Sequence, residues 1–227
     1  MPIIEAKKLT KVFGKGEVAV RAVDELDLSI EEGEFTAIVG PSGSGKTTLL
    51  NMIGGLDGPT SGEVLIDGTS IYTLSDRERT RFRLDKIGFV FQAYNLIPVM
   101  SAYENTEFTM LLQGRPEGER RKRATELLER VGLGERLDAR PNQLSGGQQQ
   151  RVAVSRALAP RPAFILADEP TANLDSVSTG NLLDIMAEMN RDEGITFVFA
   201  THDQRVIDRA RRVVTLEDGR VLHDEVR

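Results

Sequence analysis

Short apolar runs recur along the chain, and their length suits strands that are buried on both faces. The clearest are Phe35 to Val39, Ile87 to Phe91, Ala163 to Ala167 and Ile195 to Ala200. Segments with helical periodicity separate several of these runs. Because parallel strands need long crossover connections, usually helices, the pattern predicts a mostly parallel central sheet with helices on its faces.

The N-terminal region has a different pattern, in which apolar and polar residues alternate. Every second residue from Leu26 to Ile30 is apolar, which is typical of a strand with one buried face. Gly14-Lys15-Gly16 can turn the chain between strands expected at Ala6 to Phe13 and at Glu17 to Val20. The first 33 residues are therefore predicted to form antiparallel strands.

Two further hairpins are expected from their turn residues. Asp67-Gly68 is a strong turn signal inside Gly62 to Ile71, and Asp218-Gly219 separates Val213 to Leu216 from Arg220 to Leu222. Asp-Gly favours the two-residue turns that join antiparallel strands. The order of these hairpins and the buried apolar runs predicts an antiparallel side sheet next to the central one.

Residues from about Ala93 to Ala157 change in character and carry helical periodicity with few β-branched runs. The charged segment Glu117 to Arg130 places Leu127 and Leu128 on one side, as an amphipathic helix does. We interpret residues 93–157 as a helical subdomain inserted into a core made of residues 1–92 and 158–227. The whole chain is then a single domain of 227 residues.

Composition narrows the class of protein. The chain is 40 % hydrophobic and 28 % charged, and it has no cysteine, which excludes disulfides and thiol catalysis. Its apolar runs fall far short of the roughly 20 residues of a membrane span, and the charged start MPIIEAKKLT is unlike a signal peptide. A net charge of −6 argues against nucleic-acid binding. We expect a cytoplasmic protein.

The strongest chemical signal is the segment GPSGSGKTT at Gly40 to Thr48. It follows the predicted strand Phe35 to Val39 and precedes a helix expected at Thr47 to Ile53. Glycines let consecutive backbone N–H groups turn toward an anion, and the helix N-terminus adds to the positive potential. Lys46 supplies charge, and Thr47 offers a hydroxyl to Mg²⁺. This arrangement is typical of a triphosphate-binding loop.

A second segment suited to phosphate is LSGGQ at Leu144 to Gln148. Ser145 is a good N-cap, and Gly146 and Gly147 leave backbone N–H groups uncovered at the start of a helix expected at Gln148 to Ala159. Taken alone, the segment could be an ordinary capped helix after a turn.

Together with these two segments, four more motifs make the chain similar to ATP-binding cassette (ABC) ATPases, the nucleotide-driven subunits of ABC transporters. In the order of the family, the motifs are the Walker A loop at Gly40 to Thr47, the Q-loop at Gln92, the signature LSGGQ, Walker B at Ala163 to Pro170, the D-loop at Ala172 to Ser176 and the switch His202. The resemblance covers essentially the whole chain. It implies an α/β fold of the P-loop NTPase class with a mostly parallel central sheet, an antiparallel β side sheet and an inserted helical subdomain.

The resemblance also implies roles for individual residues. The residues implied as catalytic are Glu169 as general base, His202, Lys46 and Gln92. Those implied in nucleotide binding are Phe13, Gly40, Pro41, Ser42, Gly43, Ser44, Gly45, Lys46, Thr47 and Thr48. Those implied as metal ligands are Thr47, Gln92 and Asp168, the last through water. Phe13 would stack on adenine, although a place in the strand core is an alternative for it.

Two kinds of partner are implied. A second copy of the chain would dimerise head to tail, so that its Ser145, Gly146, Gly147, Gln148 and Asp175 complete the ATP site of the first. An integral membrane permease would dock near Gln92 to Tyr103, although the apolar residues there could equally pack inside the helical subdomain. The chain would then sit on the inner face of the membrane.

The stretches GGLDGPTSGEV and DKIGFVFQAYNLIP are most similar to the lipoprotein-releasing and macrolide-export branch. One alternative is a cell-division ATPase of the same family, which gates a membrane partner that controls wall hydrolases. A cassette ATPase acting on DNA or ribosomes and a metabolic kinase are weaker alternatives. The former would carry coiled coils or paired cassettes, and the latter would not explain LSGGQ.

Overall fold

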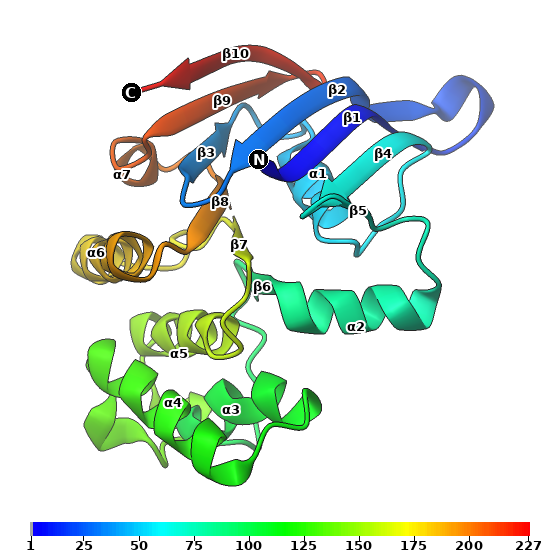
Figure 1. Cartoon of the computed structure of the whole chain (residues 1–227). Coiled ribbons are helices and arrows are strands. Elements are labelled where there is room, and N and C mark those ends of the chain that lie inside the picture. Colours follow the sequence, from blue (N-terminus) through cyan, green and yellow to red (C-terminus); the bar gives the residue numbers. More distant parts are fainter. Residues whose placement is uncertain (1) are drawn as a thin grey trace.

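The computed structural model describes residues 2–227, which form two sheets and a set of helices (Figure 1). The strands are β1 (Pro2–Phe13), β2 (Val20–Glu31), β3 (Phe35–Val39), β4 (Ser61–Ile66), β5 (Thr69–Ser70), β6 (Ile87–Val90), β7 (Phe164–Asp168), β8 (Thr196–Ala200), β9 (Arg212–Glu217) and β10 (Arg220–Val226). The helices are α1 (Lys46–Ile53), α2 (Asp76–Lys86), α3 (Ala102–Leu112), α4 (Glu117–Arg130), α5 (Gly146–Leu158), α6 (Ser176–Glu193) and α7 (Gln204–Ile207).

The larger sheet has the strand order β10-β9-β3-β8-β7-β6 within the described residues. Its neighbours from β9 to β6 are parallel, and β10 pairs antiparallel with β9 at one edge. The smaller sheet has the order β2-β1-β4-β5 and is antiparallel throughout. The predicted α/β fold, with a mostly parallel central sheet and an antiparallel side sheet, is therefore confirmed.

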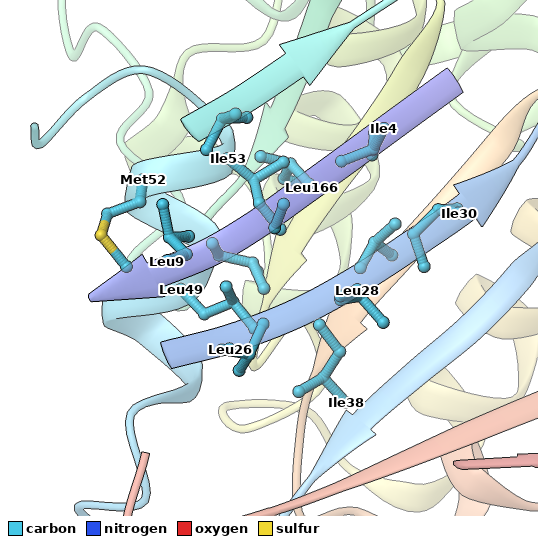
Figure 2. Close-up of a cluster of buried hydrophobic side chains, with 14 of the residues drawn as sticks. Ile4, Leu9, Leu26, Leu28, Ile30, Ile38, Leu49, Met52, Ile53 and Leu166 are labelled. Atoms are coloured by element: carbon cyan, nitrogen blue, oxygen red, sulfur yellow. The ribbon is translucent and has the colours of Figure 1, made fainter. Parts of the chain in front are cut away.

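A buried apolar cluster joins the two sheets through α1. Figure 2 shows side chains of β1, β2, β3, β7 and α1 pointing toward one another in this cluster. Its labelled members are Ile4, Leu9, Leu26, Leu28, Ile30, Ile38, Leu49, Met52, Ile53 and Leu166. The alternating apolar side chains from Leu26 to Ile30 thus face this core. The same core packs α1 against the parallel sheet.

A second cluster covers the other face of the parallel sheet. Phe35, Phe197 and Phe199 are buried there, and the ring centroids of Phe35 and Phe199 lie 4.7 Å apart. Residues of α5 and α6 pack against these strands. The central strands are consequently buried on both faces, which explains why they have continuous apolar runs in the sequence.

The strand predictions agree closely with the structure. Phe35–Val39 has the expected bounds, and β6, β7 and β8 differ from the predicted runs by one residue at their ends. The turns at Asp67-Gly68 and Asp218-Gly219 join β4 to β5 and β9 to β10 as expected.

The strand expected at Glu17 to Val20 is wrong. A 3₁₀ turn forms at Gly16–Val18, and the partner strand β2 begins only at Val20. Gly14 and Gly16 have φ angles of 78° and 63°, and these left-handed conformations, which glycine adopts readily, curl the chain before it can pair with β1.

Helices α3, α4 and α5 gather on one side of the molecule, below the parallel sheet in Figure 1. They share a small apolar cluster that includes Leu128, Leu133 and Val152. The boundaries of the inserted subdomain at residues 93 and 157 remain a prediction. In residues 2–227, none of the helices is both long enough and apolar enough to cross a bilayer.

Candidate functional site

The carboxyl ends of β3, β8, β7 and β6 lie side by side because these strands are parallel neighbours. Ala200 pairs with both Ile38 and Asp168, so the loops that follow these strands meet at one edge of the sheet. They enclose a cleft of about 570 Å³. Its lining residues are Ala22, Gly40, Pro41, Ser42, Gly43, Gly45, Lys46, Thr47, Thr48, Gln92, Glu169, Ala172 and His202. In α/β folds this edge is where ligands bind.

Two glycines of the loop between β3 and α1 are required by close packing. A Cβ atom at Gly40 would lie 2.2 Å from the carbonyl oxygen of Leu216, and one at Gly45 would lie 2.1 Å from that of Ala22. Both residues also have positive φ angles, 151° and 98°. Side chains at these positions would push the loop away from the sheet, so the loop conformation depends on glycine.

The N-terminus of α1 is open toward the cleft. Gly45 is its N-cap, no side chain caps it, and its first turn contains no acidic residue. The ammonium group of Lys46 donates hydrogen bonds to the carbonyl oxygens of Gly40 and Pro41 at 2.7 and 3.0 Å. Uncapped backbone N–H groups, the helix dipole and the lysine charge together make this end of the cleft a binding site for an anion.

The other predicted residues of the loop differ in how they face the cleft. Pro41, Ser42, Gly43 and Thr48 line it. Ser44 does not, because its side chain is buried; within residues 2–227 its hydroxyl oxygen has no hydrogen-bond partner. The N–H of Ser44 donates to the carbonyl oxygen of Pro41 at 3.2 Å, so Ser44 shapes the loop instead of lining the cleft.

The pair formed by Thr47 and Asp168 suits a hard cation. The Thr47 hydroxyl donates a hydrogen bond to a carboxylate oxygen of Asp168 at 3.1 Å. Burial raises the pKa of Asp168 above its ordinary value, an effect that the hydrogen bond from Thr47 opposes. Among the described residues there is no group of three or more histidine, cysteine, aspartate or glutamate side chains that could hold a metal. A site with only one hydroxyl and one carboxylate, those of Thr47 and Asp168, fits Mg²⁺, because this ion usually keeps several waters and is also bound by substrate phosphates.

Glu169 directly follows Asp168 and points its carboxylate toward residues after β8. One oxygen accepts a hydrogen bond from the hydroxyl of Thr201 at 3.0 Å, and the other lies 2.7 Å from Nδ1 of His202. Glu169 has a φ angle of 45°, a conformation that is uncommon outside glycine, and its N–H donates to the carbonyl of Ala200 at 2.8 Å. The turn thus holds the two adjacent acids in different directions, with Asp168 toward Thr47 and Glu169 toward His202.

Gln92 and Phe13 occupy different surroundings. Gln92 follows β6 and lines the cleft. Phe13 ends β1, is 45 % exposed, and has the ammonium of Lys11 at 5.0 Å from its ring centroid. The exposed part of the Phe13 ring is open to a planar group, but Phe13 is not one of the residues that line the cleft.

The remaining predicted site residues form a second cluster, away from the cleft. Ser145 caps α5 and forms a capping box with Gln148, in which each side chain accepts a hydrogen bond from the other's backbone N–H. Gly147 packs against Ser178 so closely that a Cβ atom would lie 2.7 Å from its hydroxyl oxygen. Asp175 caps α6 by accepting bonds from the N–H and the hydroxyl of Ser178, which lowers its pKa. The second cluster therefore joins the starts of α5 and α6.

The two clusters are separate within one chain. None of the residues from Ser145 to Gln148 lines the cleft, nor does Asp175. Figure 1 shows α5 well apart from α1. The structure therefore brings the loop, the acids, Gln92 and His202 together and leaves the signature residues outside their own chain's cleft.

Sequence reasoning missed the residues that support Glu169. Thr201 is a direct partner of the Glu169 carboxylate, although it belongs to none of the predicted motifs. Asp203 accepts a hydrogen bond from the hydroxyl of Thr171 at 2.8 Å and pairs with Arg205. These contacts tie the loop after β8 to the loop after β7. Their only sequence signal was a run of polar residues just after a buried strand.

We expect Asp203→Asn to lower the free energy of unfolding by about 1 kcal/mol at pH 6. Hydrogen bonds from Arg205 lower the pKa of Asp203 to about 2. An acid whose pKa is lower in the folded than in the unfolded state stabilises the fold above its unfolded pKa of about 3.9. We expect this stabilisation to be only about 1 kcal/mol because the side chain of Arg205 is 40 % exposed, so water screens its interaction with Asp203.

Urea unfolding of both proteins between about pH 6 and about pH 2 measures this effect. The difference between wild type and Asp203→Asn should shrink as pH falls from about 4 to about 2. A difference that stays constant over this range would show that the charge of Asp203 contributes nothing.

Comparisons with known proteins agree with this geometry. The family model described as ABC transporter matches residues 23–172. An ABC transporter ATP-binding protein of Thermotoga maritima is 49% identical over 96% of this chain and 93% of its own length. The macrolide export ATP-binding/permease protein MacB of Hyphomonas neptunium is 48% identical over 98% of this chain, which spans 34% of that longer protein. The dimeric cassette MJ0796 of Methanocaldococcus jannaschii, solved with ADP and Pi, has a TM-score of 0.91 at 46% identity and 98% coverage of both chains.

Proposed function

The chain belongs to the family of ABC transporter ATP-binding proteins, and we propose that it powers a membrane permease by forming a head-to-tail dimer that closes on ATP and reopens after hydrolysis. The observation that carries this proposal is the separation of the two clusters. The cleft holds the groups that bind and cleave a triphosphate, whereas the signature residues lie outside it. A second chain can supply them.

In this proposal the triphosphate lies along the loop from Gly40 to Thr48. The N–H groups at the start of α1 and the ammonium of Lys46 bind its β- and γ-phosphates. Thr47, Asp168 and Gln92 would hold Mg²⁺, which neutralises charge on the phosphate oxygens. Phe13 stacks on the adenine ring and adjusts affinity without taking part in catalysis.

Glu169 is the proposed general base. Its carboxylate orients a water molecule for in-line attack on the γ-phosphate and accepts a proton from it. Thr201 and His202 hold the carboxylate by the two hydrogen bonds described above. His202, whose side chain is 76 % exposed at the cleft, can also reach the γ-phosphate, so it reports whether that phosphate is present.

The second chain completes the site with the cluster at the starts of its α5 and α6. Uncovered N–H groups at Gly146 and Gly147, with the hydroxyl of Ser145, donate to the γ-phosphate from the opposite side. Hydrolysis removes the phosphate that both chains share, so the dimer opens. Asp175, next to this cluster through Ser178, lies at the proposed interface.

A groove next to the cleft is the proposed docking place of the permease. It is largely apolar, and its lining includes Phe91, Asn95, Ile97, Phe108 and Leu112. These residues overlap the segment from Gln92 to Tyr103 that the sequence suggested. Docking there would hold the chain on the inner face of the membrane. The similarity to MacB supports a permease of the macrolide-export or lipoprotein-release type.

Substitutions at Ser145 test completion of the site by a second chain. Asp and Asn are both as good as Ser at an N-cap, so Ser145→Asp and Ser145→Asn should keep α5 folded. Only Asp places a negative charge where the partner's γ-phosphate should lie. We expect Ser145→Asp to bind ATP in its own cleft with near-normal affinity but to lose ATPase activity by about 10²-fold, whereas Ser145→Asn loses much less.

Binding is measured by calorimetry, and dimerisation by light scattering with MgATP in variants that also carry Glu169→Gln. The Ser145→Asp protein should remain monomeric. The proposed arrangement of the two chains would be wrong on two results together. The first is that Ser145→Asp forms the ATP-dependent dimer in the Glu169→Gln background, and the second is that Ser145→Asp without Glu169→Gln hydrolyses ATP as fast as Ser145→Asn.

A further inference from the structure

Residues 92–95 connect the cleft to the apolar groove. At one end Gln92 lines the cleft, and at the other end Asn95 lines the groove. The segment has no regular secondary structure. Whatever holds its main chain therefore determines where the side chain of Gln92 lies relative to the cleft.

One contact comes from α5. The guanidinium of Arg156 donates hydrogen bonds to two successive carbonyl oxygens of the segment, that of Tyr94 at 3.0 Å and that of Asn95 at 2.6 Å. Burial lowers the pKa of Arg156, so this charge is partly withdrawn from water. A planar guanidinium can bridge two acceptors at once, which an ammonium cannot do with the same geometry.

A second contact comes from the loop after Glu169. The side-chain amide of Asn173 donates to the carbonyl oxygen of Gln92 at 3.1 Å. The hydroxyl of Tyr94 lies 3.5 Å from the carbonyl oxygen of Asn173. Asn95 has a φ angle of 51°, a left-handed conformation that the bond from Arg156 to its carbonyl helps to hold. The segment is thus held at both ends, from different parts of the chain.

We propose that Arg156 and Asn173 are positioning residues that together fix the main chain of residues 92–95 and so place Gln92 in the cleft. The proposal rests on the proposed function, because it assigns Gln92 a part in ATP hydrolysis. It adds a physical connection: α5 is capped by Ser145, which would face the partner's ATP in the proposed dimer, and through Arg156 the same helix holds the Gln92 segment of its own cleft. The loop that carries Glu169 is connected to the same segment through Asn173.

Steady-state kinetics with MgATP test this positioning. We expect Arg156→Lys and Asn173→Ala each to lower kcat about tenfold, since misplacement of about 1 Å can cost up to 10²-fold. The affinity for ATP, measured by calorimetry, should change less than twofold. Arg115→Lys is the matched control, because Arg115 also donates from a guanidinium to a carbonyl, that of Pro160 at 2.8 Å, and none of its side-chain hydrogen bonds within residues 2–227 is to residues 92–95.

A double substitution separates positioning from general loss of stability. If Asn173 acts only through Gln92, Asn173→Ala should lower kcat no further than twofold in a protein that already carries Gln92→Ala. If the double variant instead showed the product of the two separate reductions in kcat, the two residues would act independently and the proposal would be overturned. A wild-type protein that hydrolyses no ATP would instead contradict the proposed function, and the two failures are thereby distinguished.

A spin label gives a measure that does not depend on activity. The chain has no cysteine, and Ala93 is exposed, so Ala93→Cys provides a single labelling site within the segment. We expect slow label motion in this background and in Arg115→Lys, and faster motion when Arg156→Lys or Asn173→Ala is added. Equal spectra for all four proteins would show that neither residue holds the segment.

Discussion

Glu169→Gln is expected to lower the ATPase rate about 10²- to 10³-fold while MgATP still binds. Gln has the same shape as Glu and can still accept the hydrogen bond from Thr201, which is 3.0 Å long in the structure. It cannot take a proton from the attacking water. The variant should therefore hold intact ATP in the cleft and accumulate in the closed dimer.

Phosphate release under single-turnover conditions measures this rate, and calorimetry measures binding. Glu188→Gln makes the same chemical change on the exposed side of α6 and should leave both quantities unchanged. If Glu169→Gln retained more than a tenth of the wild-type rate, another group would have to be the base.

Lys46→Ala is expected to weaken ATP binding about 10²-fold, equivalent to about 2.7 kcal/mol. Among residues 2–227, the hydrogen-bond acceptors of the Lys46 ammonium are the carbonyl oxygens of Gly40 and Pro41, so its removal leaves no ion-pair partner unsatisfied there. The fold should stay intact, and the loss should come from the missing charge-assisted bonds to phosphate.

Calorimetric titration with MgATP checks this affinity, and thermal unfolding without nucleotide checks the fold. Lys122→Ala removes the same charge from a side chain that is 79 % exposed on α4 and should bind like wild type. Near-normal affinity in Lys46→Ala would mean that the loop between β3 and α1 does not bind the triphosphate.

The parts of the fold that the sequence predicted are those where one physical requirement dominates. Strands buried on both faces need continuous apolar residues, so β3, β6, β7 and β8 were located to within a residue. Asp-Gly turns fixed two hairpins. In contrast, α2 was not recognised, because none of its residues is buried and an exposed helix has no apolar stripe. Only its capping box at Ser75 and Glu78 marked its start.

For the candidate site, as for the fold, the sequence predicted the parts that depend on a local requirement. Glycines at Gly40 and Gly45 are required by close packing, so the phosphate loop could be identified from spacing alone. The contacts among side chains of the site could not be identified from the sequence in this way. The hydrogen bond from Thr201 to Glu169 depends on the register between β7 and β8. The hydrogen bonds from Arg156 to the carbonyl oxygens of residues 94 and 95 join positions that lie far apart in the sequence. Such contacts follow from tertiary packing, not from local pattern.

The proposed head-to-tail arrangement would explain why a chain carries signature residues that do not reach its own cleft. Ser145 and its neighbours sit at a helix start that is held by the capping box, which engages the N–H groups of Ser145 and Gln148 but not those of Gly146 and Gly147. Because the capping box already holds this helix start, contact with ATP in the proposed dimer would need little reordering. A preformed surface of this kind favours association that is controlled by nucleotide alone.

The most direct test of this account is the molar mass of the Glu169→Gln protein in solution, measured by light scattering with and without MgATP. One chain has a mass of 25.1 kDa. The account predicts about 25 kDa without nucleotide and about 50 kDa, twice that mass, with saturating MgATP. A mass that stays at one chain while calorimetry shows MgATP bound would contradict it.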